Sequence, residues 1–254
     1  MTKLFARLQS ALLLTGQILV HLLQLKIYRG NTIEQMSFVG PSSLPIALIT
    51  SAFVGMVFTI QVAREFIYFG ATSAVGGILA IALTRELAPV LTAVVLAGRV
   101  GSAFAAEIGT MRVTEQIDAL QILKTDPVDY LVTPRVISCV LMLPILTICS
   151  LLVGIGAGLI IAQSIYDIPS QIFLDSIRNF LEVWDVIACL IKSSVFGACV
   201  AIIGCNWGLT TTGGAKGVGQ STTAAVVISL LAIFMFNFIL SWLMFQGTGS
   251  AVLG

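Results

Sequence analysis

Long apolar runs separated by short polar stretches dominate the chain. An α-helix needs about 20 apolar residues to cross a bilayer, and five runs are of this length: residues 41–63, 74–98, 136–166, 186–205 and 222–245. Pro45 is tolerated in the first turn of a helix, whereas Pro144 lies inside the third run and predicts a kink. The pattern therefore predicts an all-α integral membrane protein with five transmembrane helices in a single domain, residues 1–254.

The first thirty residues follow an amphipathic pattern instead. Polar side chains recur at helical spacing, opposite a face of Leu, Ile, Val and Phe; the polar positions are Lys3, Arg7, Ser10, Gln17, His21 and Gln24. A helix with two such faces lies in the membrane interface and does not cross it. We therefore expect an interfacial helix over residues 1–30, with His21 on its solvated face.

Composition supports the membrane assignment. The chain is 57% hydrophobic and 10% charged, with a mean hydropathy of +1.04, whereas soluble domains carry about 25% charged residues. The net charge of +1 provides no basic field that would attract nucleic acid. The five cysteines lie singly in apolar runs without metal-ligand spacing, so we expect them to pack as small apolar residues. No metal and no cofactor is expected.

The placement of Lys and Arg predicts the topology. Nine of them precede the first run or lie between runs two and three or four and five: Lys3, Arg7, Lys26, Arg29, Arg99, Arg112, Lys124, Arg135 and Lys216. On the opposite side lie Arg64 and Arg178. Because positive residues favour the cytoplasmic side, we expect a cytoplasmic N-terminus and a C-terminus on the outside.

Two adjacent charges stand inside the second apolar run. Arg85 and Glu86 lie near its middle, and Pro89 follows within one turn. A charge at that depth costs about 2.5–3.5 kcal/mol on insertion scales. Adjacent side chains diverge on a helix, so each needs another helix or water. Pro89 has no N–H, so the carbonyl of Arg85 loses its helical partner. These groups predict a hydrated or ligand-lined cavity; the alternative is an interhelical ion pair that serves packing.

Lys192 is the other charge inside a predicted span. It lies seven residues from the outer end of the fourth run, which corresponds to a depth of about 10 Å. From there its side chain could extend to the membrane surface. A role in the same polar site and a simple surface position are both open.

The longest predicted cytoplasmic stretch lies between the second and third runs. Its apolar positions fall on one helical face and its acidic positions fall off it: Val113, Ile117 and Leu120 against Glu115 and Asp118. This pattern predicts an amphipathic helix from about Thr110 to Leu123. Such a helix is either a solvated connector or a docking element for a cytoplasmic partner.

Glycines occur in two further settings. Residues 208–222 are glycine-rich, but a phosphate loop requires GxxxxGK[ST] after a strand, and here Gly213 is followed by Gly214 and Ala215. We interpret this stretch as a flexible turn between two spans, and the sequence displays no nucleotide site. Gly154 and Gly158 in the third run form a small-residue face that would allow close approach of another helix.

The stretch RELAPVLTAVVLAGRVGSAFAAEIGTMRVTEQIDAL, from Arg85 to Leu120, resembles the signature of MlaE-type (YrbE-type) permeases. The similarity extends over nearly the whole chain, including CLIKS in the fourth run. These permeases are membrane subunits of ABC transporters that work with MCE-domain lipid-binding proteins. The resemblance implies a homodimer, two cytoplasmic ATPase subunits, a ring of MCE proteins on the far side, and movement of phospholipid between membranes.

The resemblance also implies roles for particular residues. Arg85 and Glu86 would line the lipid pathway, to which we add Pro89 and Lys192 because of their positions. The region from Glu107 to Leu123 would be the coupling helix; its candidate contacts are Glu107, Thr110, Arg112, Glu115, Ile117, Asp118 and Leu120. The chain would carry no catalytic residue. Its host would be a bacterial inner membrane or a plastid inner envelope.

Other functional classes compete with this interpretation. A secondary transporter also places charges at mid-depth, but it usually has internal repeats, and five spans do not divide into two halves. A structural scaffold needs no buried charge. An intramembrane enzyme needs a nucleophile and a base, and the predicted spans contain neither His nor Asp. A secondary transporter or a scaffold subunit without ATP coupling therefore remains the alternative.

Overall fold

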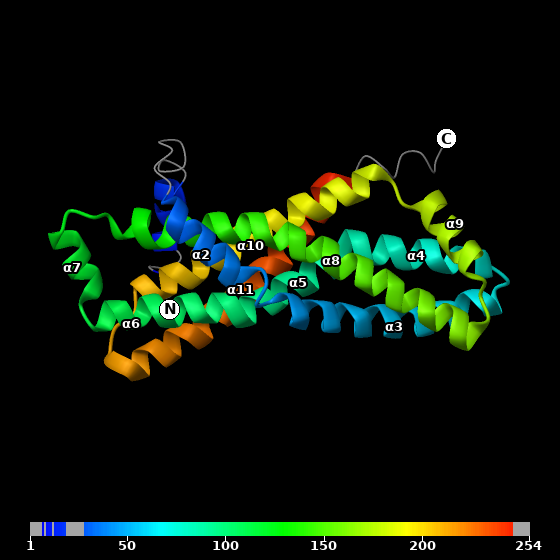
Figure 1. Ribbon diagram of the computed structural model, residues 1–254, viewed down its shortest axis with the longest axis horizontal. Coiled ribbons are helices and arrows are strands. Elements are labelled where there is room, and N and C mark those ends of the chain that lie inside the picture. The colour runs from blue at the N-terminus through cyan, green and yellow to red at the C-terminus, as the bar shows by residue number, and fades with distance from the viewer. Residues whose placement is uncertain (1–6, 8, 12, 19–27, 246–254) are drawn as a thin grey trace. The chain divides into compact units, whose positions relative to one another are not determined.

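Most residues that the structure describes are helical. The computed structural model describes residues 7, 9–11, 13–18 and 28–245 (Figure 1). Within these residues, five helices are long and apolar enough to cross a membrane: Arg29–Tyr68, Thr72–Val113, Val128–Tyr166, Val183–Leu209 and Gly214–Phe245. The five predicted spans are confirmed as helices of this kind. Each helix is longer than the apolar run that predicted it.

Several of these helices contain local breaks. The elements are α2 (Arg29–Val39), α3 (Leu44–Tyr68), η1 (Thr72–Ala74), α4 (Val75–Ala82), η2 (Leu83–Leu87), α5 (Ala88–Leu96), η3 (Ala97–Gly101), α6 (Ser102–Val113), α7 (Gln116–Ile122), η4 (Val128–Val132), α8 (Thr133–Tyr166), α9 (Ser170–Phe180), α10 (Val183–Leu209) and α11 (Gly214–Phe245). The segment η1 is a 3₁₀ turn, whereas η2, η3 and η4 are π-helical turns. Pro45 lies in the first turn of α3, as expected.

Two helices extend further than the sequence pattern indicated. The helix of the second predicted span continues beyond residue 98, through η3 and α6 to Val113. Residues 208–222 are not one flexible turn, because α11 already begins at Gly214. Gly217 and Ser221 are buried on α11, so packing offsets the weak helix propensity of this glycine-rich sequence. Residues 7, 9–11 and 13–18 are helical, whereas Lys3, His21 and Gln24 of the predicted interfacial helix lie outside the described residues.

The chain forms two compact units, each assembled from separate segments. The first comprises Met1–Ser43, Ala93–Leu143 and Ser194–Met235, and the second comprises Leu44–Thr92, Pro144–Ser193 and Phe236–Gly254. The helices α5, α8, α10 and α11 each contribute residues to both units.

In the second unit, α3 packs against α8 through small residues. Every fourth residue of α3 is buried along one stripe: Ala47, Ser51, Gly55, Thr59 and Ala63. A Cβ on Gly55 would lie 2.1 Å from the carbonyl oxygen of Gly154, and one on Gly158 would lie 2.6 Å from the hydroxyl of Thr59. The predicted close approach at Gly154 and Gly158 is therefore confirmed. Figure 1 shows α3 and the C-terminal part of α8 side by side.

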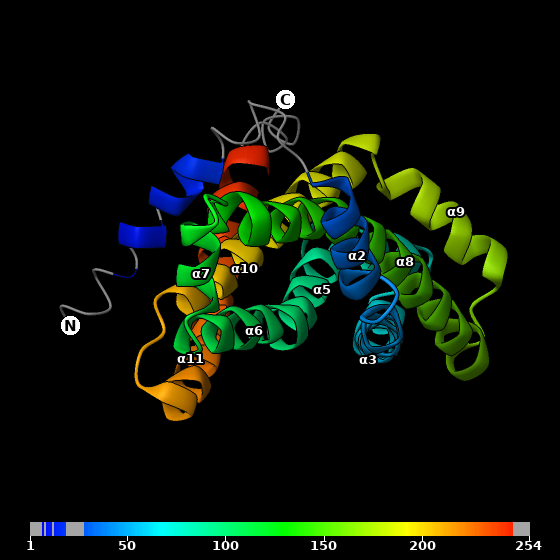
Figure 2. The same cartoon turned by 60° about the vertical axis from the view of Figure 1, so that its left-hand side comes forward.

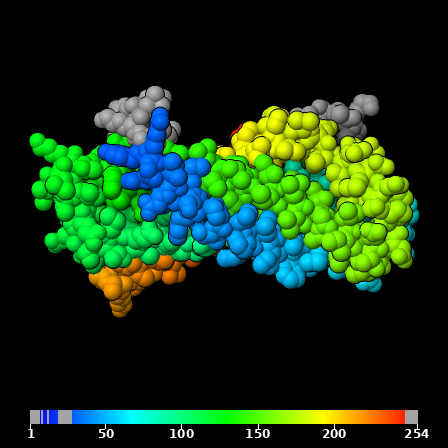
Figure 3. All heavy atoms as spheres, viewed as in Figure 1, coloured from blue at the N-terminus to red at the C-terminus, as the bar shows by residue number. Residues whose placement is uncertain are grey.

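The opposite face of α3 is apolar and exposed. Its large side chains include Ile46, Ile49, Phe53 and Val57, each about half exposed or more, and Figure 3 shows side chains of α3 on the visible surface. A helix with a small buried stripe and a bulky exposed stripe is typical of a membrane span that faces lipid or another helix.

The amphipathic helix α9 packs along α4 in the second unit. Gly76 and Gly77 permit this contact, because a Cβ on Gly76 would lie 2.3 Å from the carbonyl oxygen of Phe173. The backbone N–H of Gly77 donates to the hydroxyl of Ser176 at 2.9 Å. The polar face of α9 carries Arg178, which is exposed, so this helix covers α4 with one face and presents the other to solvent.

In the first unit, glycines bring α10 close to the end of the second span. A Cβ on Gly204 would lie 2.8 Å from the carbonyl oxygen of Gly101, and one on Gly208 would lie 2.7 Å from the Cβ of Ile108. The helix α11 joins this packing through its own small stripe, which consists of Gly217, Ser221, Ala225, Ser229 and Ile233.

Candidate functional site

Arg85 and Glu86 lie in the π-helical turn η2. The backbone N–H of Ala88 donates to the carbonyl of Leu83, five residues earlier, instead of the fourth as in an α-helix. Such π-turns often occur at functional sites. The two side chains diverge from this turn and find different partners, as expected for neighbours on a helix.

Arg85 forms an ion pair with the first turn of α10. Its Nε donates to Oδ1 of Asp185 at 2.7 Å, and Asp185 is buried while the Arg85 side chain is 28% exposed. The other carboxylate oxygen of Asp185 accepts from the backbone N–H of Glu182 at 3.1 Å. The ring of Phe245 lies 4.6 Å from the guanidinium carbon of Arg85, a favourable cation–π distance.

Glu86 is bonded to two other helices. Its Oε1 accepts from Nζ of Lys192 at 3.0 Å and from the hydroxyl of Ser241 at 2.7 Å. Its Oε2 accepts from the amide of Asn237 at 2.6 Å. The side chain nevertheless remains 43% exposed, so part of this hydrogen-bonded carboxylate is open at the surface of the chain.

Lys192 is completely buried, and the predicted possibility that it reaches the membrane surface is wrong. Its Nζ donates to Oε1 of Glu86, to Oγ of Ser241 at 2.8 Å and to the backbone carbonyl of Arg85 at 2.6 Å. An ammonium group has three donors, and all three are used. The third bond satisfies the carbonyl that Pro89 leaves without an N–H donor.

We call these residues the charged cluster: Arg85, Glu86, Asp185, Lys192, Asn237 and Ser241. It contains two cations and two carboxylates and is formally neutral, which lowers the cost of holding ions among apolar side chains. The structure thus satisfies the polar groups by interhelical pairing, as in the packing alternative. Arg85 and Glu86 remain partly exposed, which a purely internal ion pair does not require.

An apolar groove of about 260 Å³ lies in the same unit as the charged cluster. It is lined by Phe53, Val54, Val57, Phe58, Gln61 and Leu87. Leu87 follows Glu86 directly in η2. Partly exposed charges and an apolar groove within one unit are the two kinds of surface that a molecule with a polar head and an apolar body requires.

Three members of the charged cluster were not predicted from the sequence: Asp185, Asn237 and Ser241. The predicted fourth run began one residue after Asp185, which excluded that carboxylate from the membrane. Its spacing held a signal, because Asp185 and Lys192 are seven residues apart and so lie on one face of α10. Asn237 and Ser241 are likewise four residues apart on α11, and this pair within an apolar run was a further signal.

The predicted amphipathic helix from Thr110 to Leu123 is two helices, and that prediction is wrong as a single element. The helix α6 ends at Val113, and α7 begins at Gln116. Glu115 between them has φ of 61°, a left-handed conformation that ends the α-helical hydrogen-bond pattern. An ion pair between Arg112 and Asp118 closes the bend. Figures 1 and 2 both show α7 turning sharply away from α6.

The apolar residues of α7 do not face the direction that the sequence indicated. Ile117 is 3% exposed and packs inward, whereas Ile122 and Leu123 at the end of α7 are 82% and 74% exposed. Leu120 is half-buried, and Glu115 and Thr110 are exposed. The exposed apolar surface is therefore the tip of α7.

Glu107 and Thr110 line a groove of about 480 Å³ in the first unit, together with Ala106, Met111 and Arg135. Oε2 of Glu107 accepts from Nη2 of Arg135 at 2.9 Å. Arg135 is buried, and its guanidinium carbon lies 5.3 Å from the ring of Phe104. The groove is therefore fixed by an ion pair between α6 and the beginning of α8.

Known proteins match the chain over most of its length. The family model described as Permease MlaE matches residues 32–243. A probable ABC transporter permease protein of Synechocystis sp. is 70% identical over 250 residues, which cover 98% of this chain and 95% of that protein. The chloroplastic protein TRIGALACTOSYLDIACYLGLYCEROL 1 of Arabidopsis thaliana is 50% identical over 243 residues, 96% of this chain and 69% of that protein. A probable ABC transporter permease protein of Pyropia yezoensis is 52% identical, over 98% of this chain and 95% of that protein.

Proposed function

The chain belongs to the MlaE permease family, and from this premise we propose that it is the permease subunit of an ABC transporter that moves phospholipid between membranes. The observation that carries the lipid substrate is that one unit holds both a partly exposed charged cluster and an apolar groove. A phospholipid has a charged head and apolar chains, which match these two surfaces. The name of the Arabidopsis relative is that of a glycolipid, which supports a lipid substrate.

In this proposal the exposed parts of Arg85 and Glu86 meet the head group. Arg85 uses Nε for Asp185, and within the described residues its two terminal NH₂ groups make no hydrogen bond. Such groups bind phosphate oxygens in pairs. Lys192 and Pro89 act indirectly, because Pro89 offers no N–H to the carbonyl of Arg85 and Lys192 donates to that carbonyl instead.

We further propose that a separate ATPase docks on the tip of α7. Ile122 and Leu123 form an exposed apolar pair suited to a groove on a soluble partner. Glu107, Thr110 and Arg112 on α6 would carry the resulting movement to the second span, and Asp118 would hold α7 to α6. Ile117 and Leu120 would support α7 from within, and Glu115 would set its angle.

The arrangement in the membrane follows from charge placement. The excess of Lys and Arg on one side of the predicted spans supports a cytoplasmic N-terminus and an outer C-terminus. Under this topology α7 faces the cytoplasm, whereas α9 faces the opposite side, where an MCE-domain partner would deliver or receive lipid. A homodimer would bring two copies of the exposed Arg85 and Glu86 to a shared pathway.

Reconstitution tests the proposal directly. Purified permease in vesicles, with its ATPase and MCE partners, should transfer labelled phospholipid to acceptor vesicles only when ATP is hydrolysed. Transfer that follows an ion gradient without ATP would indicate a secondary transporter. Complex formation without any transfer would indicate a scaffold. Hydrolysis of ATP by the purified chain alone would contradict a separate ATPase.

A further inference from the structure

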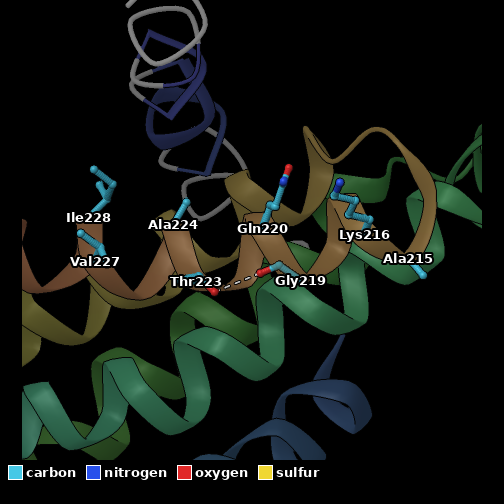
Figure 4. A pocket seen from close by; sticks show the side chains of 8 residues that line it. All are labelled: Ala215, Lys216, Gly219, Gln220, Thr223, Ala224, Val227 and Ile228. Atoms are coloured by element: carbon cyan, nitrogen blue, oxygen red, sulfur yellow. Dashed lines mark hydrogen bonds between the residues drawn. The ribbon is translucent and has the colours of Figure 1, made fainter.

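A second polar cavity, of about 380 Å³, lies in the first unit. Its polar lining consists of Arg7, Trp207, Thr212, Gln220 and Ser221, and we call it the Arg7 cavity. Gln220 also lines the neighbouring open groove of α11 that Figure 4 shows, where its side chain points to the same side of the helix as Lys216. The Arg7 cavity shares no residue with the charged cluster.

The wall that carries Arg7 is fixed by a buried amide. Nδ2 of Asn206 donates to the backbone carbonyl of Arg7 at 2.9 Å, and Oδ1 of Asn206 accepts from the hydroxyl of Ser10 at 2.9 Å. Nη2 of Arg7 donates to the carbonyl of Thr210 at 3.1 Å. Asn206 is only 2% exposed, so a buried amide holds Arg7 and Ser10 against the end of α10.

Ser221 is a buried polar side chain with an unused hydroxyl. It is 2% exposed, lines the Arg7 cavity, and within the described part of the chain makes no hydrogen bond through its side chain. Trp207, which is 1% exposed, also lines the cavity. The Ser221 hydroxyl is therefore free to bond an occupant of the cavity.

The chemistry of the lining selects the occupant. It offers a guanidinium, two hydroxyls, an amide and an indole N–H, and none of the lining residues is a carboxylate. The first turn of α11 contributes Gly217 to the same wall, and the N-terminal end of a helix favours negative charge. An anion with several acceptor oxygens satisfies all these donors, and guanidinium binds phosphate especially well.

We propose that the Arg7 cavity binds a phosphate group, supplied either by a phospholipid head group or by a soluble phosphate ester. Arg7 supplies the charge, and Ser221 and Trp207 supply hydrogen bonds from the buried wall. This site is separate from the proposed transport pathway and does not depend on it. A permease without transport activity would still carry the site.

Binding to the purified full-length chain in detergent tests the proposal. The probes are glycerol 3-phosphate, phosphatidic acid in mixed micelles, and diacylglycerol, which has the same chains without phosphate. Arg7→Gln and Ser221→Ala should each weaken binding of the phosphate-bearing probe by about tenfold, the effect of one hydrogen bond to a charged group. Ser229→Ala is the matched control, since Ser229 is also buried on α11 with an unpartnered hydroxyl but does not line the cavity.

Each result of these binding measurements either supports or overturns the proposal. Binding of phosphatidic acid alone would identify a lipid head group as the source, and binding of glycerol 3-phosphate as well would extend the site to soluble esters; both support the proposal. Equal binding of diacylglycerol, or unchanged affinity in both variants, would overturn it. Should Arg7→Gln fail to fold, Arg7→Lys keeps the charge but not the paired donors. It should lose about threefold to tenfold in affinity, and unchanged affinity would overturn the role of Arg7.

Discussion

The ammonium nitrogen of Lys192 lies 2.6 Å from the carbonyl oxygen of Arg85. In an uninterrupted α-helix that carbonyl would accept from the N–H of residue 89, but residue 89 is a proline. A side chain from α10 therefore replaces a backbone hydrogen bond of the second span, and the same ammonium group pairs with Glu86. One ammonium group therefore serves both the carbonyl that Pro89 leaves without a donor and the carboxylate of Glu86.

Replacing Glu86 and Lys192 by uncharged glutamine, singly and together, distinguishes a packing role of the charged cluster from a role in transport. Glu86→Gln leaves the buried Lys192 without its carboxylate and should cost about 3 kcal/mol of stability. Lys192→Gln should cost a similar amount, because Glu86 then lacks its cation. The double variant should recover much of this loss, since two amides can bond to each other. Thermal unfolding in detergent measures all three variants.

The rate of lipid transfer by the double variant then shows whether Glu86 acts in transport. We expect the stable double variant to transfer lipid at least tenfold more slowly, because the head group has lost its ionic contact. Wild-type transfer by a stable double variant would show that the cluster serves packing alone. Glu65→Gln removes an exposed carboxylate from α3 and should change neither measurement.

The tip of α7 should be the ATPase contact. Leu123→Asp places a charge on a residue that is 74% exposed, so folding should be unaffected while ATPase stimulation and lipid transfer fall together. Ile117→Asp buries a charge and should instead lower the yield of folded protein. Gln121→Asp, at an exposed neighbouring position, is the control. Full coupling in Leu123→Asp would contradict docking at this tip.

Close packing of α3 on α8 should make Gly55 intolerant of any side chain. Gly55→Ala would place a methyl group 2.1 Å from the carbonyl oxygen of Gly154, and the overpacking should cost about 1–3 kcal/mol. Gly156 on α8 has no atom within 4 Å of its added Cβ, so Gly156→Ala should be neutral or stabilising by about 0.5–1 kcal/mol. Equal melting temperatures for the two variants would refute this packing argument.

Topology can be tested by thiol labelling. In a background without the five native cysteines, Gly254→Cys should react with a membrane-impermeant maleimide added outside intact cells. Lys124→Cys, in the segment after α7, should react only after the membrane is opened. The reverse pattern would place α7 on the outer side and remove the basis for ATPase docking there.

The sequence predicted the spans well because length and hydropathy determine them locally. It missed details that depend on contacts between distant segments. Ile117 was assigned to an exposed face because the pattern distinguishes apolar from polar positions but not which apolar face packs inward. The break between α6 and α7 falls at Glu115, which has a left-handed backbone conformation. No glycine or proline marks this position in the sequence. Asp185 was missed because its ion pair with Arg85, 100 residues away, is what keeps it buried.

The π-turns η2 and η3 have a consequence for how the second span presents its sides. Each holds one residue more than the α-helical turn it replaces, which advances the angular phase of everything that follows by about 100°. The helix from Thr72 to Val113 is therefore interrupted twice, and each interruption changes which residues share a face. A helical wheel drawn through all of it assigns positions after η2 to the wrong side. Deleting one residue within η2 would convert it to an α-helical turn and leave the orientation of the following residues unchanged.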